Sequence, residues 1–177
     1  MLRFRNALLV LLALSAVSAL AGQAKRAIKV SVQFYRVAAT IDTQSIRAIG
    51  SAQTKATPTI LQVTPAEAAR IAGIVKKGGG SLVGSPSVVT NVGEEAKISA
   101  DYDSGSYTLD VTPSNKGSDT ITLNFKLILT SISGNRKITR SAKSFARVQE
   151  AKALLIIVNP RDGQEGFMAV LRAAKTK

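Results

Sequence analysis

Carboxylates and aromatic side chains are the only groups in this chain whose spacing suggests chemistry. The 177 residues include no cysteine and no histidine. Their absence removes the usual transition-metal ligands, the commonest general base and the parts of Cys-His and Ser-His-Asp nucleophilic sites. We therefore expect a protein that is not an enzyme, with no catalytic residues, no metal ligands and no cofactor.

The acidic segment 101–105, DYDSG, has the alternating carboxylates of a calcium-binding loop. Such a loop needs a glutamate at its twelfth position, where this chain has Thr112, so a plain hairpin turn is the favoured interpretation. Glu94 and Glu95 are adjacent in an expected turn, and we interpret them as a solvated charge pair. An enzyme that acts on envelope polymers through these carboxylates is the least supported alternative.

Tyr102 and Tyr107 stand on either side of the same expected turn. Two aromatic rings placed in this way can form a stacking platform for a base or a sugar. They can equally form a cross-strand pair that only stabilises the hairpin, which is the commoner arrangement and the one we favour.

The charge balance is strongly basic, with 24 Lys and Arg against 11 Asp and Glu and a formal net charge of +13. Such a surface attracts anions, for example cell-wall polymers, lipopolysaccharide phosphates or nucleic acid. Only three basic pairs are adjacent in the sequence: Lys25-Arg26, Lys76-Lys77 and Arg136-Lys137. We therefore favour a generally basic soluble surface, and a dedicated polyanion site is the alternative.

The first 21 residues have the pattern of a secretory signal peptide. Arg3 and Arg5 precede an apolar run over 7–20, and residues 19–21 form a small-x-small cleavage site. An uncleaved N-terminal anchor is the alternative. We expect an exported protein, in the periplasm, at the outer membrane or secreted, with one domain over 22–160.

Hydrophobic periodicity predicts that this domain is mainly β with one α-helix, built as an antiparallel sheet or sandwich. Alternating apolar and polar residues indicate half-buried strands, and the continuous apolar run 154–158 indicates a central buried strand. The weakly patterned segment 41–59 is expected to be a loop with room for a short helix at 44–49. The basic end, 161–177, is expected to be a loose tail or a short amphipathic helix. The other expected strands are 28–38, 60–63, 82–92, 95–102, 107–112, 120–131 and 137–148.

The residues from Thr64 onward predict a helix. Thr64 is an expected N-cap, Pro65 suits the first helical position, and Glu67 completes a capping box. Gly78 is expected to end the helix in the left-handed conformation. Because the glycine run 78–80 follows the helix and does not precede one, we interpret it as a helix stop and not as a phosphate cradle.

The order of motifs after this helix resembles the core of the secretin family, the outer-membrane rings of type II and type III secretion systems. The family's first strand pair carries S-x-P-x-hydrophobic-x-T-x-x-G-x-x-A, matched here by Ser85, Pro86, Val88, Thr90, Gly93 and Ala96. A strand that ends in V-T-P follows, matched by Val111, Thr112 and Pro113. Thr139 and Arg140 match a later T-R strand, and Pro160 and Arg161 match the closing T-P-R.

The resemblance implies that these motif residues are structural and that the protein works in strand-mediated assembly or docking at the cell envelope, in secretion or pilus-type machinery. The implied partners are copies of itself or envelope and secretion proteins, with membrane association. Compared with the family, we expect a truncated core that lacks the N-terminal ring modules, the gate insertion before Tyr107 and the segment between Val148 and Ala153. An assembly that pools strands from several copies is the alternative to a single sandwich.

The alternative function is a periplasmic or secreted module that binds DNA, lipopolysaccharide or a cell-wall polymer. It follows from the charge alone, and nucleic acid is not expected to be the main partner.

Overall fold

The computed structural model describes residues 27–38, 43–54, 58–103, 105–115, 119–133, 136–158 and 166–176. Within these ranges the chain forms two antiparallel sheets and two short helices, which confirms the mainly-β class. The expected signal peptide over residues 1–21 lies outside the described residues.

The elements follow the sequence periodicity closely in most places. In chain order they are β1 (Ala27–Val37), α2 (Thr43–Arg47), β2 (Ser51–Thr54), β3 (Thr59–Val63), α3 (Pro65–Lys77), β4 (Ser81–Gly84), β5 (Ser87–Asn91), β6 (Ala96–Tyr102), β7 (Gly105–Asn115), β8 (Thr120–Ser133), β9 (Arg136–Gln149), β10 (Ala153–Val158) and β11 (Gly166–Lys175).

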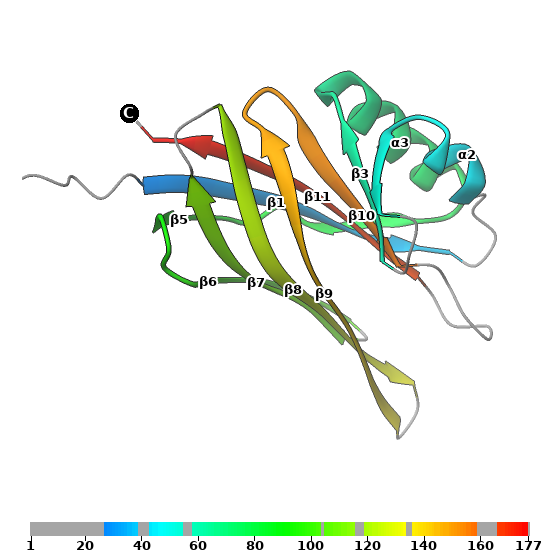
Figure 1. Cartoon of the computed structure of the whole chain (residues 1–177). Helices are drawn as coiled ribbons and strands as arrows, with labels where there is room; N and C mark the ends of the chain where they lie inside the picture. Colours follow the sequence, from blue (N-terminus) through cyan, green and yellow to red (C-terminus); the bar gives the residue numbers. More distant parts are fainter. Residues whose placement is uncertain are drawn as a thin grey trace, which may run out of the picture.

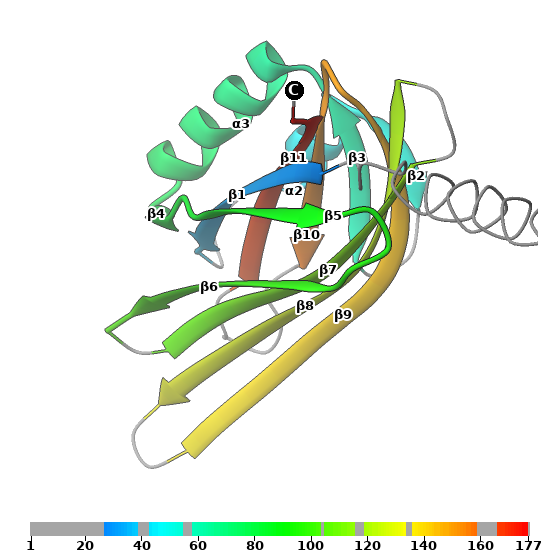
Figure 2. The same ribbon diagram turned by 90° about the vertical axis from the view of Figure 1, so that its left-hand side faces the viewer.

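The strands form two layers, and α3 forms a third (Figures 1 and 2). Sheet A has the order β2-β3-β10-β11-β1-β4, with β5 also paired to β1, and sheet B has the order β6-β7-β8-β9. Sheet B packs against one face of sheet A, and α3 covers part of the other face. The molecule is therefore a sandwich with a helix on its outside.

Two apolar clusters hold the three layers together. The larger cluster lies between the sheets and includes Phe34, Tyr107 and Phe167. The smaller cluster lies between sheet A and α3 and includes Ile71 and Leu155. Strands β10 and β11 contribute to both clusters, which explains why their sequences are continuous apolar runs and do not alternate.

The expected capping box of α3 is present. Thr64 Oγ1 accepts a hydrogen bond from the Glu67 amide at 3.2 Å, and Glu67 Oε2 accepts one from the Thr64 amide at 2.6 Å. The hydrogen bond from the Thr64 amide is the main cause that lowers the pKa of the Glu67 carboxyl.

The C-terminal end of α3 corrects one expectation. Gly78 has φ −83°, so it does not take the left-handed conformation. Gly79 takes that conformation, with φ +82°. The amide of Gly80 then donates to the Val75 carbonyl at 2.8 Å, so the chain reverses one residue later than the sequence suggested.

The expectation of a tail or short helix over residues 161–177 is wrong. Residues 166–175 form β11, which lies between β10 and β1 near the centre of sheet A. Every residue from Gly166 to Leu171 is buried, because the strand is covered on both faces. The folded domain therefore extends to Lys175, beyond the expected boundary at 160.

The segment around Pro86 forms an interrupted edge. Strand β4 pairs with β1 at residues 34–36, and β5 pairs with β1 at residues 27–31. Pro86 lies in the break, where its carbonyl accepts a hydrogen bond from the Val32 amide at 3.0 Å. The edge position expected for this proline is confirmed. The expected strand pair is wrong, because β5 and β6 belong to different sheets and the turn between them crosses the sandwich.

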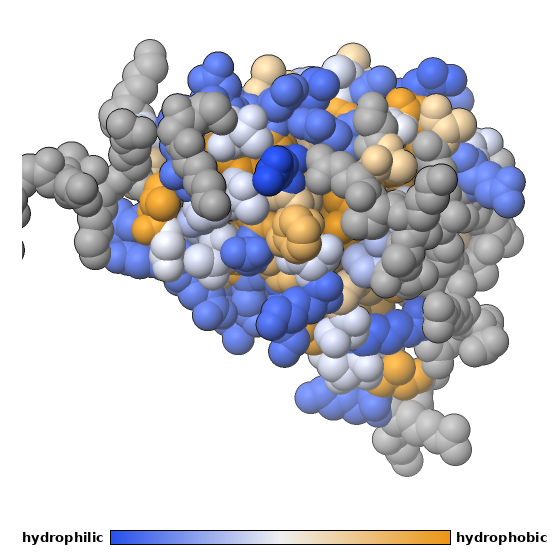
Figure 3. Space-filling model, in the orientation of Figure 1, coloured by the Kyte–Doolittle hydropathy of each residue, from blue (hydrophilic) through white to orange (hydrophobic). Residues whose placement is uncertain are grey.

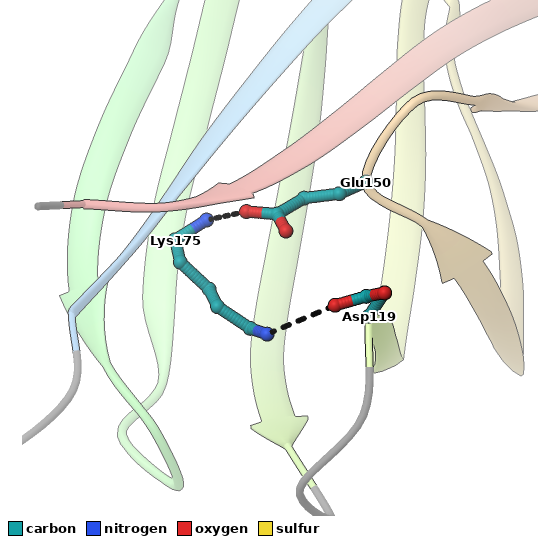
Figure 4. Close-up of polar contacts among 3 residues, drawn as sticks. All are labelled: Asp119, Glu150 and Lys175. Carbon is teal, nitrogen blue, oxygen red and sulfur yellow. Dashed lines mark hydrogen bonds and ion pairs between the residues drawn. The ribbon is translucent and has the colours of Figure 1, made fainter.

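A polar contact joins the two sheets where β9 leads into β10 (Figure 4). The Lys175 amide in β11 donates to Glu150 Oε1 at 2.7 Å, and Lys175 Nζ lies 3.9 Å from Asp119 Oδ1. The Glu150 amide also donates to the Asp119 carbonyl at 3.1 Å. Since the Asp119 side chain is 97% exposed, the ion pair with Lys175 contributes little stability.

Candidate assembly and anion-binding surface

Strands β8 and β9 form a long, uniformly basic hairpin. Each strand has 14 residues, and they pair without interruption from Thr120 opposite Gln149 to Ser133 opposite Arg136. Neither strand contains Asp or Glu, and together they contain Lys126, Arg136, Lys137, Arg140, Lys143 and Arg147. A large part of the chain's net charge of +13 is therefore concentrated in one hairpin.

The two faces of this hairpin differ because side chains alternate along a strand. The inner face of β8 is buried against sheet A, as its alternation predicted, through Ile121, Leu123, Phe125, Leu127 and Leu129. On the outer face the register places Lys126 opposite Lys143 and Asn124 opposite Phe145. The outer face therefore presents cations and an aromatic ring.

A row of charged side chains crosses the outer face of sheet B. The strand registers place Lys97 opposite Asp110, Asp110 opposite Lys126, and Lys126 opposite Lys143. Lys97 Nζ lies 3.8 Å from Asp110 Oδ1. Within the part of the chain that the structure describes, no carboxylate lies within ion-pair distance of Lys126 or Lys143. Two like charges thus stand directly opposite each other, an arrangement that destabilises a sheet.

The ring of Phe145 stands beside this row. It is 68% exposed, more than any other large apolar side chain that the structure describes, and it lines a shallow groove on the outer face together with Lys126 and Lys143. The acids of the groove are Glu95, just before β6, and Asp110 in β7, which lies opposite Lys126. Figure 3 shows this face, where apolar patches lie among hydrophilic side chains over the middle of sheet B and near the tip of the β8–β9 hairpin.

Strand β9 is the last strand of sheet B. Among the described residues, no strand pairs with its outer edge, so the backbone amides and carbonyls there can accept a further strand. Basic side chains along an edge are also a common protection against uncontrolled pairing. Pairing of this edge with another basic strand would place like charges opposite each other, which is unfavourable.

The structure brings two of the expected motifs together. The Gly93 amide donates to the Pro113 carbonyl at 2.8 Å, and Ala96 lies opposite Val111. Gly93 has φ +85°, a conformation that other residues rarely adopt, which explains why this turn needs glycine. The first motif and the V-T-P motif thus meet at residues 92–95, where the chain crosses from sheet A to sheet B. We call this connection the crossing turn.

The other motif residues lie elsewhere. Ser85 is exposed in the break before β5, and Val88 and Thr90 lie on β5 at the edge of sheet A. Thr112 points to the outer face between the buried residues Val111 and Pro113. Thr139 and Arg140 lie on β9, opposite Thr130 and Leu129, far from the crossing turn. Pro160 and Arg161 lie outside the described residues, and the roles of all these residues stay predictions.

The two tyrosines pack into the core. Tyr107 is 1% exposed, stacks on Phe34 at 5.4 Å between ring centroids and meets the edge of Phe167 at 5.9 Å. Tyr102 lies 5.2 Å from Tyr107. The pair stabilises the sandwich, as we favoured, and the buried Tyr107 cannot stack on a ligand.

The carboxylates at 94, 95, 101 and 103, which the sequence places at turns, lie at two turns of the fold. Among the described residues, no three potential metal ligands cluster. Glu94 Oε2 accepts a hydrogen bond from Asn91 Nδ2 at 2.7 Å, so it belongs to the crossing turn.

No described helix has the length and hydrophobicity to cross a membrane.

The residues that share the outer face of the β8–β9 hairpin were not predicted from the sequence: Lys126, Lys137, Lys143 and Phe145. The signal was present in the sequence, because the alternation of the two strands and the register of their pairing fix which side chains share this face. Lys126 and Lys143 are not adjacent to another basic residue in the sequence, so a search for adjacent basic pairs does not find them.

The sequence matches no protein-family model and no curated relative. Solved structures similar to the chain include the type II secretion secretin XcpQ of Pseudomonas aeruginosa (TM-score 0.47, 12% identity), the pilotin–secretin complex AspS–GspD of ETEC (0.49, 13%) and ExeD of Aeromonas hydrophila (0.47, 13%). The chain resembles secretins. Each match covers 94% of this chain and 63%, 52% and 52% of the respective solved chains, so the chain spans less than two thirds of their length.

Proposed function

We propose that this protein is a non-enzymatic structural component of the cell envelope, exported to the periplasm or the outer membrane. In this proposal it assembles with copies of itself or with other envelope proteins through its strands, in type II/III secretion or pilus-type machinery. The observation that carries the proposal is the long edge strand β9, whose outer edge is unpaired within the described structure. An exposed strand edge is a template for adding another strand.

The charges of sheet B favour one way of pairing. Two β9 strands from two copies would bring cations together, which costs stability. The opposite edge of sheet B is β6, whose two charged residues, Lys97 and Asp101, give it no net charge, so a β9 strand beside it meets less repulsion. Pairing of β9 with β6 of the next copy is therefore the favoured contact. Such a head-to-tail contact generates a closed ring or an open filament.

The ordered motifs give additional support. The crossing turn joins two of them through the Gly93–Pro113 hydrogen bond, so this part of the secretin-like pattern corresponds to one rigid unit of the fold. In this proposal the crossing turn fixes the position of sheet B, and therefore of its edge strands β6 and β9.

Light scattering of the full chain, with and without detergent, tests the assembly. We expect a mass many times the 18.6 kDa of one chain. Asp101→Lys places a cation at the β6 edge and is expected to shift the protein toward the monomer. Arg70→Glu on the exposed side of α3 is the matched control and should leave the mass unchanged. A monomer under both conditions contradicts the proposal.

A second candidate function is a module that binds soluble polyanions. It is supported by the concentration of basic residues, without acids, in β8 and β9. This function predicts binding of a DNA oligonucleotide or of the lipopolysaccharide polysaccharide, with an affinity that falls steeply as salt rises. Binding that is absent or insensitive to salt removes this candidate.

A further inference from the structure

We propose that the outer face of the β8–β9 hairpin docks on an anionic lipid surface. In this arrangement Lys126 and Lys143 bind headgroup phosphates, and Phe145 enters the boundary between headgroups and acyl chains. The inference goes beyond the proposed assembly, because a monomer presents the same face.

Within the described residues, Lys126 and Lys143 have no carboxylate at ion-pair distance. Lys126 and Lys143 stand directly opposite each other, both are exposed, and Asp110 is engaged by Lys97 on its other side. Opposed residues of an antiparallel pair have Cα atoms roughly 4.5–5.5 Å apart, so their ammonium groups repel in the isolated protein. A phosphate bound between them removes this repulsion. A local arrangement that opposes stability without a gain elsewhere in the fold indicates a functional surface.

The apolar side chains on the same face distinguish a lipid surface from other polyanions. Phe145 lies opposite Asn124, and Ile132, which is 55% exposed, lies opposite Lys137. A base of single-stranded nucleic acid can stack on Phe145 while the backbone satisfies the lysines, but Ile132 then stays in water. A surface of anionic lipids accepts cations and large apolar groups together, because phosphates lie directly above the acyl chains.

The geometry of the face suits an extended contact. From Asn124, the residue opposite Phe145, to Ile132 the hairpin runs roughly 27 Å at about 3.4 Å per residue. Lys126 and Lys143 lie within this length, and Lys137 lies at its end. The acids Glu95 and Asp110 lie toward β6 and β7. The charge gradient therefore orients the molecule with the β8–β9 side toward the lipid.

Co-sedimentation of the full chain with vesicles tests the docking. The vesicles contain either phosphatidylcholine alone or phosphatidylcholine with phosphatidylglycerol, at low and at physiological salt. We expect binding only to the phosphatidylglycerol vesicles. A lysine near an anionic surface contributes about fivefold to the partition coefficient, so Lys126→Gln with Lys143→Gln should lower it about 25-fold. Phe145→Ser should lower the partition coefficient several-fold. The binding that remains should be electrostatic and therefore sensitive to salt.

The matched control carries the same charge change elsewhere. Arg70→Gln with Lys76→Gln neutralises two exposed cations on α3, on the far side of sheet A. This control should bind nearly as well as the unchanged protein. An equal loss in the control and the hairpin variant overturns the inference, because net charge alone would then explain binding. Equal binding to both kinds of vesicle, or binding to a DNA oligonucleotide without binding to vesicles, also overturns it.

Two further measurements complete the test. Competition with inorganic phosphate separates a headgroup surface from a site for a free anion, and we expect no displacement beyond that caused by the same ionic strength of chloride. Light scattering of each variant separates docking from assembly. A monomer that binds the vesicles contradicts the proposed assembly and leaves the docking intact.

Discussion

The central strands of sheet A and the β8–β9 hairpin of sheet B use the same residue types for opposite purposes. Phe167 in β11 is fully buried between the sheets, whereas Phe145 in β9 is among the most exposed apolar side chains. Strands β10 and β11 are covered on both faces, by sheet B and by α3, and β9 is covered on one. Residues of a doubly covered strand are committed to packing, while a free face can carry cations and an aromatic ring for a partner.

The largest expected effect compares these two phenylalanines. Phe167→Ala should lower the free energy of unfolding by about 3–5 kcal/mol, because it leaves a cavity beside Tyr107. Phe145→Ala should change it by less than about 0.5 kcal/mol, since the ring is largely in water. Urea unfolding followed by circular dichroism measures both. Similar losses in the two variants would show that Phe145 packs against the protein in solution.

The next effect compares two glycines. A Cβ on Gly105 would collide with the carbonyl oxygen of Thr130 in β8, a backbone atom that cannot turn away. Gly105→Ala should therefore destabilise the protein by about 1–3 kcal/mol in thermal or urea unfolding.

Gly73 on α3 is the matched control for this change. A Cβ there has no neighbour within 4 Å, so Gly73→Ala should stabilise the protein by about 0.5–1 kcal/mol. A stabilising Gly105→Ala would mean that β7 and β8 can separate at this point.

Removal of the helix cap tests how strongly α3 covers sheet A. Thr64→Ala removes the hydroxyl that accepts from the Glu67 amide, and it should destabilise the protein by about 1 kcal/mol. Thr64→Ser keeps the hydroxyl and should retain most of the stability. Hydrogen exchange of the α3 amides would locate the loss, and unchanged exchange in the alanine variant would contradict it.

A smaller change in stability, of opposite sign, is expected from a substitution on the outer face of sheet B. Lys143→Glu replaces the repulsion with Lys126 by attraction and should stabilise the protein by about 0.2–1 kcal/mol. Lys97→Glu breaks the contact with Asp110 and should destabilise it. The stabilised variant should bind anionic vesicles less well, and a gain in both properties would break the link between repulsion and docking.

The smallest effect concerns pH. Because the pKa of Glu67 is lower in the folded protein than its ordinary value of 4.5, its contribution to stability is present above that value. The contribution is lost as the pH falls through the lowered pKa. Unfolding of the unchanged protein and of Glu67→Gln, measured at pH 7 and pH 3, should show a larger loss on acidification in the unchanged protein.

The sequence alone predicted most of the strands and the one long helix. The alternation of residues 120–131 and the apolar run 154–158 each reflect how many faces of the strand are covered, and that is a local property. The capping box at Thr64 and Glu67 is also local, because its two hydrogen bonds join residues three apart.

The errors arose where tertiary contacts decide. The run Phe167 to Leu171 fits a helix face as well as a buried strand, and only its place between β10 and β1 selects the strand. The turn at Gly93 was predicted, but nothing in its residues shows whether the next strand pairs within the sheet or crosses to another. The short β2, in the polar segment after α2, exists because β3 offers it an edge.

The position of β11 also determines the order in which the molecule can be completed. Thr176 Oγ1 at its end donates to the Ala27 carbonyl at 3.0 Å, across 149 residues of chain. While the protein is being synthesised, β1 and β10 lack the strand that joins them, and sheet A remains two separate pieces. Folding to completion therefore waits for the last described strand, and such distant pairings make it slow. Until then the unpaired edges of β1 and β10 and the apolar surface beside them are exposed, which makes the incomplete fold prone to aggregation.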